Sequence, residues 1–452
     1  MLMVVPALVF ASALQAQPAA APPAMPVEPA IPATPVDPVA SQSEAVAGPV
    51  TQDASSKGEA AAPLPPSLPD NPPLQKDGHL KLGVGIRGRV DVRFNDADSS
   101  GQRRTSTHLS FDTVILKLDY DSSTFFGAAE YRFYGGNFIY SRKNGYEGIP
   151  GEINFPAYAY VGAKLSASDK VTVGLQPVPF DDRYWGSSWY NSMGFVYGLE
   201  EVYDVGISYA HTGGKVSVAA GLFPTTGPAV MGQSRDSARY SVNIVRGDSY
   251  LPDTSSNAER NIVAGRIQYA VASSDRGKLT LTGSAWLSDV HNFDTDRDGS
   301  RRAYALSLTD ETTPLRKKLL VARQVINPAN AGRSDLIAVG DYDSSYNIAA
   351  KSTMVFGELS HPIETGRFPL KVNLYGSYAR VFKDAAGFAD TQRFNLGAFW
   401  TDKATGRIRV WTEALVGRND PYVGAGQFIS GGAQGGDNRW KVSALVMAGY
   451  YF

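Results

Sequence analysis

The last residues, Lys441-Val-Ser-Ala-Leu-Val-Met-Ala-Gly-Tyr-Tyr-Phe452, set the pattern on which the fold of this chain rests. Their alternate positions form two faces: one runs from Val442 to Phe452 and is wholly apolar, and the other begins with Lys441. A period of two residues is typical of a β-strand. A strand of this length with an aromatic end can also cross a membrane as part of a barrel. Whether the chain forms a barrel depends on how often this pattern recurs.

The alternation does recur along the chain from Leu80 onwards. About fourteen segments show it clearly, among them 82–94, 114–120, 127–133, 157–165, 171–175, 205–209, 216–222, 263–271, 279–287, 370–378, 394–400, 408–416 and 442–452. The less regular stretch 290–350 can supply two more strands, over 301–309 and 316–326, which avoids a structureless connection of roughly 55 residues. We therefore predict an all-β, transmembrane antiparallel β-barrel of about sixteen strands, with about fourteen or eighteen as the alternatives.

The predicted connections alternate in length. Short turns at 122–123, 167–169, 212–214, 273–277 and 403–406 separate long connections over 95–107, 135–155, 177–203, 224–259 and 418–437. Outer-membrane barrels have short periplasmic turns and long outer loops. A soluble β-sandwich would also alternate, but it would not combine one-sided apolar faces with so many strands.

Composition removes several other classes. The chain has 452 residues and a net charge of −1, which gives no case for nucleic acid as a partner. It contains no Cys, which excludes disulfides and thiolate metal sites. After the N-terminus no run of about 18 apolar residues occurs, so helical membrane spans are not expected.

The N-terminal part differs in kind from the barrel region at 77–452. Residues 1–16 form an apolar segment that ends in small residues, which is typical of a signal peptide cleaved after Ala16, although the charged start is missing. Residues 17–76 are rich in Pro and Ala, which predicts a disordered periplasmic linker or tether. A short buried helix over the first segment is the alternative.

The inward faces of the predicted strands carry an excess of basic residues. They would attract anions into a pore, and guanidinium groups suit phosphate and carboxylate. The alternative is that these groups pair with acids across the lumen, such as Asp91, Asp112, Glu130 and Glu413, and only brace the wall. The candidate pore-lining basic ladder comprises Arg87, Arg89, Arg93, Arg132, Arg266, Lys371, Arg393, Arg407 and Arg409.

The connection at 177–203 is unusually aromatic. Folded inward, it would narrow the pore and offer rings to sugars or apolar solutes; packed outward, it would contact a neighbouring subunit. Aromatic rings at strand ends also anchor barrels at the membrane surface. The candidate constriction residues are Phe180, Tyr184, Trp185, Trp189 and Tyr190.

One acidic motif invites comparison with a calcium loop. Asp294, Asp296 and Asp298 have the spacing of the first ligands of such a loop, but Ala305 stands where its closing Glu belongs. A solvated turn is the better interpretation, and we expect neither a metal nor a cofactor.

Over about 80–452 the chain resembles Gram-negative outer-membrane porins. The resemblance rests on the alternating strands, the alternating connection lengths and the terminal Tyr450-Tyr451-Phe452. Within that class the stretches Gln176-Pro-Val-Pro-Phe180 and Gly198-Leu-Glu-Glu-Val-Tyr-Asp204 are similar to those of phosphate-selective and related sugar porins.

The resemblance implies passive diffusion of small hydrophilic solutes across the cell outer membrane, with a preference for anions or sugars. It also implies contact with outer-membrane lipid, a homotrimer, and a role for Phe452 in the signal that the barrel-assembly machinery reads. Two other functions remain open: a non-conducting anchor tied to the cell wall, and an outer-membrane barrel hydrolase. A barrel of this size leaves an aqueous channel, which argues against the anchor. No Ser/His or acidic catalytic arrangement can be assembled for the hydrolase.

Overall fold

The structure, a computed structural model, describes residues 77–97, 102–135, 151–181, 192–253, 255–363, 366 and 368–452. The predicted signal peptide over 1–16 and linker over 17–76 lie outside the described residues. Within the described residues, no helix is long and apolar enough to cross a membrane.

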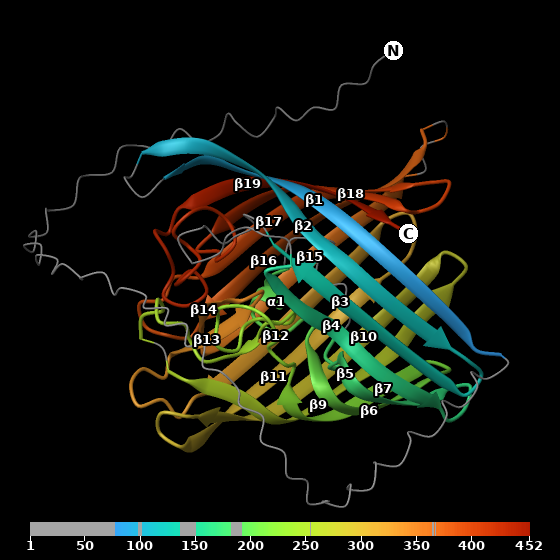
Figure 1. The fold of residues 1–452 in the computed structure, drawn as a ribbon, viewed down its shortest axis with the longest axis horizontal. Helices are drawn as coiled ribbons and strands as arrows, with labels where there is room; N and C mark the ends of the chain where they lie inside the picture. Colours follow the sequence, from blue (N-terminus) through green and yellow to red (C-terminus); the bar gives the residue numbers. More distant parts are fainter. Residues whose placement is uncertain are drawn as a thin grey trace, which may run out of the picture. The chain divides into compact units, whose positions relative to one another are not determined.

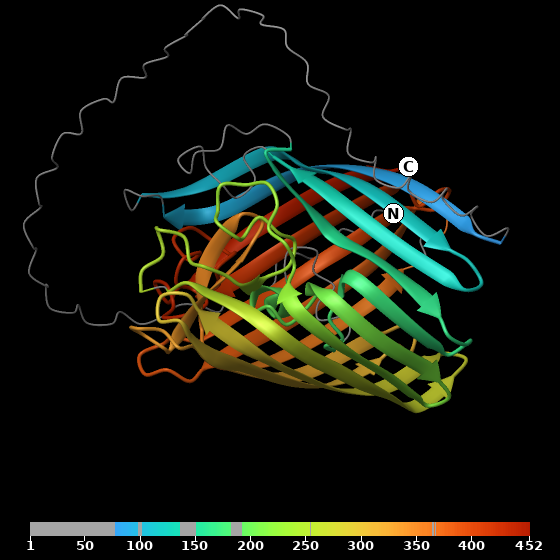
Figure 2. The same cartoon turned by 60° about the horizontal axis from the view of Figure 1, so that its bottom comes forward.

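The described strands confirm the predicted fold class and strand number, because sixteen of them close into one antiparallel barrel (Figures 1 and 2). Each barrel strand pairs with the barrel strands before and after it in the chain, and the barrel closes where the first strand pairs with the last. The barrel strands are β1 (His79–Ala97), β2 (Arg103–Asp121), β3 (Phe125–Tyr134), β4 (Ile153–Lys164), β5 (Asp169–Pro177), β6 (Tyr203–Gly213), β7 (Val216–Thr226), β9 (Asn257–Ser274), β10 (Gly277–Asn292), β11 (Arg297–Asp310), β12 (Arg316–Asn327), β15 (Lys351–Ile363), β16 (Leu370–Lys383), β17 (Thr391–Asp402), β18 (Ile408–Arg418) and β19 (Trp440–Tyr451).

The two faces of β19 separate as its sequence predicts. Val442 and Tyr450 point outward and are 38% and 47% exposed, whereas Leu445 and Met447 point inward and are 2% and 1% exposed. The inward pair packs with Trp411 of β18. Large apolar side chains are exposed on the other barrel strands too, as expected of a wall that faces hydrocarbon.

Two expectations about strand limits were wrong. β15 is absent from the alternating segments because its inward face mixes apolar and polar residues: Met354 and Phe356 are buried inside the barrel, and so are Ser352 and Ser360. The connection predicted over 95–107 is mostly strand, since β1 and β2 stay paired as far as Ala97 and Arg103. There the two strands carry polar residues on both faces, so the apolar alternation disappears although the hydrogen-bonded ladder continues.

The barrel has two unlike ends. We call the end with the short connections, such as 122–124, 214–215 and 275–276, the turn rim; His79 and Phe452 lie there. We call the opposite end the loop rim. It carries the connections 178–202, 227–256, 328–350 and 419–439, and also the four-residue link 293–296 between β10 and β11.

Three short strands form an interior sheet that belongs to the loop rim. β13 (Leu336–Asp341) pairs with β14 (Ser344–Ala349) and with β8 (Asn243–Ile244), which comes from a different connection. Every residue of β8 is buried, and all but Tyr342 along the hairpin 336–349 are buried as well. The sheet and the helix α1 (Met193–Val196) share one apolar core with the inward faces of the barrel wall. Figure 1 labels α1 near the middle of the barrel and β13 and β14 at its left end, among the connections of the loop rim.

Candidate functional site: the barrel lumen

The connection 178–202 reaches across the lumen to the opposite wall. It leaves β5, yet its Asp181 carboxylate accepts hydrogen bonds from Ser307 of β11 (2.6 Å) and Lys318 of β12 (2.7 Å). The Phe180 ring meets Trp286 of β10 edge-on, with 6.0 Å between centroids. Because β6, β7 and β9 separate β5 from these strands, the connection narrows the lumen.

The second half of this connection is fixed just as firmly. The Tyr346 hydroxyl of β14 donates to the carbonyl of Val196 at 2.7 Å, and the Tyr197 hydroxyl donates to the carbonyl of Gly432 at 2.9 Å. Arg301 of β11 donates to the carbonyl of Gly198 at 2.6 Å.

Of the predicted constriction residues, Phe180 is packed inside the barrel and is 6% exposed. The other predicted constriction residues, Tyr184, Trp185, Trp189 and Tyr190, lie outside the described residues.

The two buried arginines of β1 are paired with acids. Arg87 lies 2.7 Å from a carboxylate oxygen of Asp112, and Arg89 lies 2.6 Å from Asp91. The register between β1 and β2 shifts after Arg87, and this irregularity brings Asp112 opposite the two guanidinium groups. A bulge of this kind cannot be read from alternation, so the sequence did not reveal the pairing.

Two other cations of the predicted ladder are also neutralised. Arg132 pairs with Glu130 and lies 4.4 Å from the ring centroid of Tyr240. Arg393 holds Asp420 of the connection 419–439 through two hydrogen bonds of 2.6 Å each. The Arg393–Asp420 pair and the contact of Arg132 with Tyr240 each join the wall to a connection, which is the bracing arrangement, whereas Arg132 and Glu130 lie on the same strand.

The remaining ladder residues are placed differently. Arg266 donates to the backbone carbonyl of Asp181. Among the described residues, no carboxylate lies within 4 Å of Arg93, Lys371, Arg407 or Arg409. The last three lie at or near the turn rim, where Arg409 rests 4.6 Å from the ring centroid of Tyr451.

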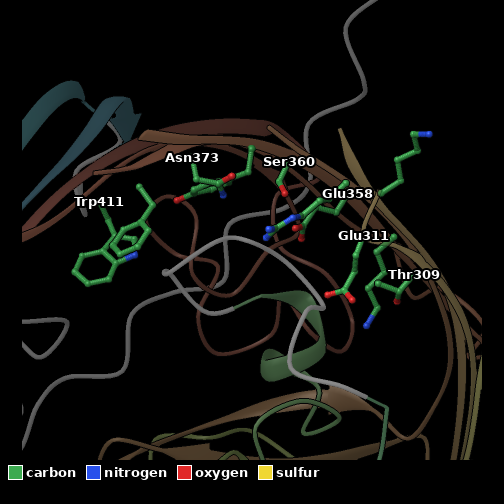
Figure 3. A pocket seen from close by; sticks show the side chains of 11 residues that line it. Thr309, Glu311, Glu358, Ser360, Asn373 and Trp411 are labelled. Carbon is green, nitrogen blue, oxygen red and sulfur yellow. The ribbon is translucent and has the colours of Figure 1, made fainter. Parts of the chain in front are cut away.

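A cavity of about 210 Å³ opens on the inner wall towards the turn rim (Figure 3). At one end Phe399 and Trp411 are stacked, with centroids 4.8 Å apart and ring planes at 28°. Apart from these two rings the lining is mostly polar or charged, and none of its residues belongs to the predicted basic ladder or to the predicted constriction residues. The lining residues are Thr309, Glu311, Arg316, Lys317, Lys318, Glu358, Ser360, Asn373, Tyr375, Phe399 and Trp411.

The acidic motif at 294–298 does not converge on one point. The carboxylate of Asp294 accepts hydrogen bonds from Ser255 (2.7 Å) and from the amide of Ser256 (2.9 Å). Asp298 instead contacts His291 at 2.9 Å, and the side chain of Asp296 is 96% exposed. Over the part of the chain that the structure describes, no group of three acidic or histidine side chains could hold a metal ion.

Comparison with solved structures places the fold in a known class. The outer membrane channel DcaP of Acinetobacter baumannii shares 13% identity with this chain, with a TM-score of 0.53 over 84% of this chain and 98% of that one. OmpF of Salmonella typhi, in complex with daunomycin, gives the same identity and TM-score over 83% of this chain and 98% of its own. This chain therefore has the fold of Gram-negative outer-membrane porins. No family model and no curated protein matches its sequence.

Proposed function

We propose that this chain is an outer-membrane porin through which small hydrophilic solutes diffuse passively. Support comes from the sixteen-stranded wall with exposed apolar side chains and from a lumen narrowed by its own connections. Outer-membrane barrels have short turns in the periplasm and long loops outside, so the turn rim of this barrel would face the periplasm and its loop rim the outside. Residues 1–16 would then be the signal peptide and 17–76 a periplasmic linker.

We further propose that passage favours anions. The observation that carries this is the distribution of charge: the buried arginines are neutralised, whereas Lys371, Arg407 and Arg409 have no carboxylate within 4 Å among the described residues. Cations without counter-charges at a pore mouth raise the local concentration of anions. Selectivity would therefore reside near the turn rim rather than in the ladder of β1.

The test is electrophysiological. The protein purified from outer membranes is inserted into a planar bilayer, and the reversal potential is measured across a KCl gradient. Ion conductance with chloride preference is expected. A protein that inserts but does not conduct would overturn the porin proposal, and potassium preference would overturn the anion preference alone.

Sugars are a second candidate solute, favoured by the cavity of Figure 3. A stacked aromatic pair offers an apolar face to a sugar ring, and the lining carries charges of both signs, which suits a neutral solute better than an ion. Asn373 Oδ1 and Thr309 Oγ1 are buried there without a hydrogen-bond partner among the described residues. An unmade buried hydrogen bond costs about 1–3 kcal/mol, which a bound hydroxyl group could offset.

Current block separates the two solutes. Maltose that interrupts the current of the wild type, but not that of Trp411→Ala, would support the sugar site. If Trp411→Ala leaves the reversal potential unchanged, the residues that set the anion preference are separate from the sugar site. Phosphate that blocks where maltose does not would favour the anion alone.

Two partner proposals follow from the same fold. A homotrimer is consistent with the porin fold and is tested by the mass of the detergent-solubilised protein. Phe452 is proposed as part of the signal for the barrel-assembly machinery, and the residue is 55% exposed at the turn rim.

A further inference from the structure

A second cavity, which is shallow and widely open to the outside and has a volume of about 470 Å³, lies on the outer wall of the barrel over β9, β10 and β11, towards the loop rim. Its wall includes Val263, Leu287 and Tyr304, which point outward and are 44–50% exposed. The cavity coincides with a register shift between β9 and β10 at Leu287 and Asp289. Asn261, in the extra stretch of β9, adopts a left-handed backbone with φ of 53°. The hollow is thus made by an irregular backbone and not by a missing side chain.

The cavity straddles a sharp change from apolar to polar surface. On β9 the outward residues pass from Val263 to Asn261, and on β10 they pass from Leu287 to Asp289. On β11 they pass from Tyr304 to Arg302, which pairs in register with Leu287. Such a boundary, with an aromatic ring on its apolar side, is typical of the interface between hydrocarbon and lipid headgroups.

Two guanidinium groups stand on the polar side of this boundary. Arg302 lines the cavity, and Arg260 neighbours it in register with Asp289. Both are exposed, and among the described residues neither has a carboxylate within 4 Å. Asp289 is the single carboxylate of the cavity lining, and the side-chain amide of Asn261 donates to it at 2.9 Å.

The position of Arg260 is supported by a ring. Its guanidinium lies 5.4 Å from the ring centroid of Phe293, and Arg246 of the connection 227–256 lies 4.0 Å from the same centroid. One aromatic ring therefore gathers two cations beside the cavity. Asp236 interacts with Arg246, whereas Arg260 and Arg302 outnumber Asp289, the one carboxylate of the cavity lining.

We propose that this cavity binds a membrane lipid with an anionic phosphate headgroup. The phosphate contacts Arg302 and Arg260, because guanidinium groups match phosphate oxygens in pairs. The acyl chains cover Val263, Leu287 and Tyr304, so that the lipid fills the hollow left by the register shift. The inference rests on the proposed membrane location, but not on conduction or on any solute preference.

The proposal is tested by native mass spectrometry of the full-length protein in detergent, with phosphatidylglycerol or phosphatidylcholine added at equal concentration. We expect the wild type to retain several-fold more phosphatidylglycerol. The double variant Arg260→Gln/Arg302→Gln should fall to the phosphatidylcholine level. Arg276→Gln, an exposed arginine at the other end of the same hairpin, is the matched control and should behave as the wild type.

Three outcomes would overturn the proposal. These are equal retention of the two lipids by the wild type, an unchanged lipid preference in the double variant, and a loss of oligomer mass in the double variant, which would assign this face to a second copy of the chain. Inorganic phosphate that displaces the lipid would show a simple ion site instead. Planar-bilayer conductance of the same samples tests the porin function separately, since the double variant should conduct as the wild type does.

Discussion

Lys318 Nζ lies 2.7 Å from a carboxylate oxygen of Asp181, a residue 137 positions earlier in the chain, and the two side chains are 3% and 1% exposed. This pair fastens the connection 178–202 to the far wall of the barrel. We therefore expect the width of the lumen to depend on this ion pair, which neither the turns nor the strand alternation of the sequence predict.

Replacing Asp181 with Asn should weaken this attachment, because it removes the carboxylate that lies 2.7 Å from the buried ammonium group of Lys318. Loss of one member of a buried pair costs about 3–5 kcal/mol, so the thermal unfolding temperature should fall and the single-channel conductance should rise. Lys317→Gln is the control, because that side chain is 51% exposed. An unchanged conductance in Asp181→Asn would mean that the connection does not set the width of the pore.

Arg393 offers a test of geometry at constant charge. Its guanidinium meets both oxygens of Asp420, and an ammonium group cannot reproduce that arrangement. Arg393→Lys should therefore loosen the connection 419–439, with hydrogen exchange there faster by about tenfold, equivalent to 1.4 kcal/mol. Arg380→Lys, whose side chain is 41% exposed beside Asp390, should leave this exchange unchanged.

The interior sheet should become more stable as pH falls. Burial raises the pKa of Asp341 to about 8, against a hydrogen bond from Tyr422 that opposes the shift. Burial likewise raises the pKa of Asp343 to about 6, although the amides of Gln233 and Ser234 oppose it. Raised carboxyl pKa values mean that the folded sheet binds protons that the unfolded segment releases. Its stability is therefore greatest near pH 4, declines up to about pH 8 and is flat above that value.

Hydrogen exchange of 336–349 between pH 5.5 and 8.5, corrected for intrinsic exchange rates, measures this effect. The expected change is on the order of 1 kcal/mol per pH unit. Asp341→Asn should remove most of the dependence above pH 6 while keeping the shape of the side chain. A wild type whose protection increases with pH would contradict the assignment.

The proposed anion preference predicts that replacing cations at the turn rim and replacing a buried arginine will have different effects. Lys371→Gln with Arg409→Gln should move the reversal potential towards that of a neutral pore while the fold is retained, because neither side chain has a carboxylate within 4 Å among the described residues. Arg87→Gln should instead remove the nearer of the two arginines beside the buried carboxylate of Asp112 and lower the unfolding temperature. Equal effects of the two changes on selectivity would place the filter along the whole wall.

Deleting Phe452 should impair assembly more than conduction. Its amide and carbonyl exchange backbone hydrogen bonds of 2.9 and 2.7 Å with Val84, at the seam where β19 meets β1. Heat-modifiable mobility on gels would report the folded fraction in outer membranes. Phe452→Tyr, which keeps the ring and the backbone, should assemble as the wild type does.

Much of the wall could be predicted from the sequence because a membrane barrel shows its structure in alternate residues. β19, with Val442 outward and Leu445 inward, is such a case. β15 was not predicted because its inward face mixes apolar residues such as Met354 with polar residues such as Ser352, which interrupts the alternation. The interior sheet was not predicted because its strands are short and because polar as well as apolar residues are buried in it, so burial cannot be inferred from hydrophobicity.

The lumen was less predictable than the wall. Basic residues could be assigned to the inward face, but their partners depend on register, as Asp112 shows, or on a distant loop, as Asp420 shows. The cavity on the inner wall is lined by residues of six strands, which become neighbours only when the strands pair in the folded barrel. These strands are β11, β12, β15, β16, β17 and β18.

The interior sheet makes two connections dependent on each other. β8 comes from the connection 227–256, whereas β13 and β14 come from the connection 328–350. Shortening either connection would remove the strands that pair with the other and expose apolar residues of the interior sheet to water, which favours aggregation and does not simply widen the opening. A variant designed to widen this barrel should therefore lack both connections, or have both replaced together.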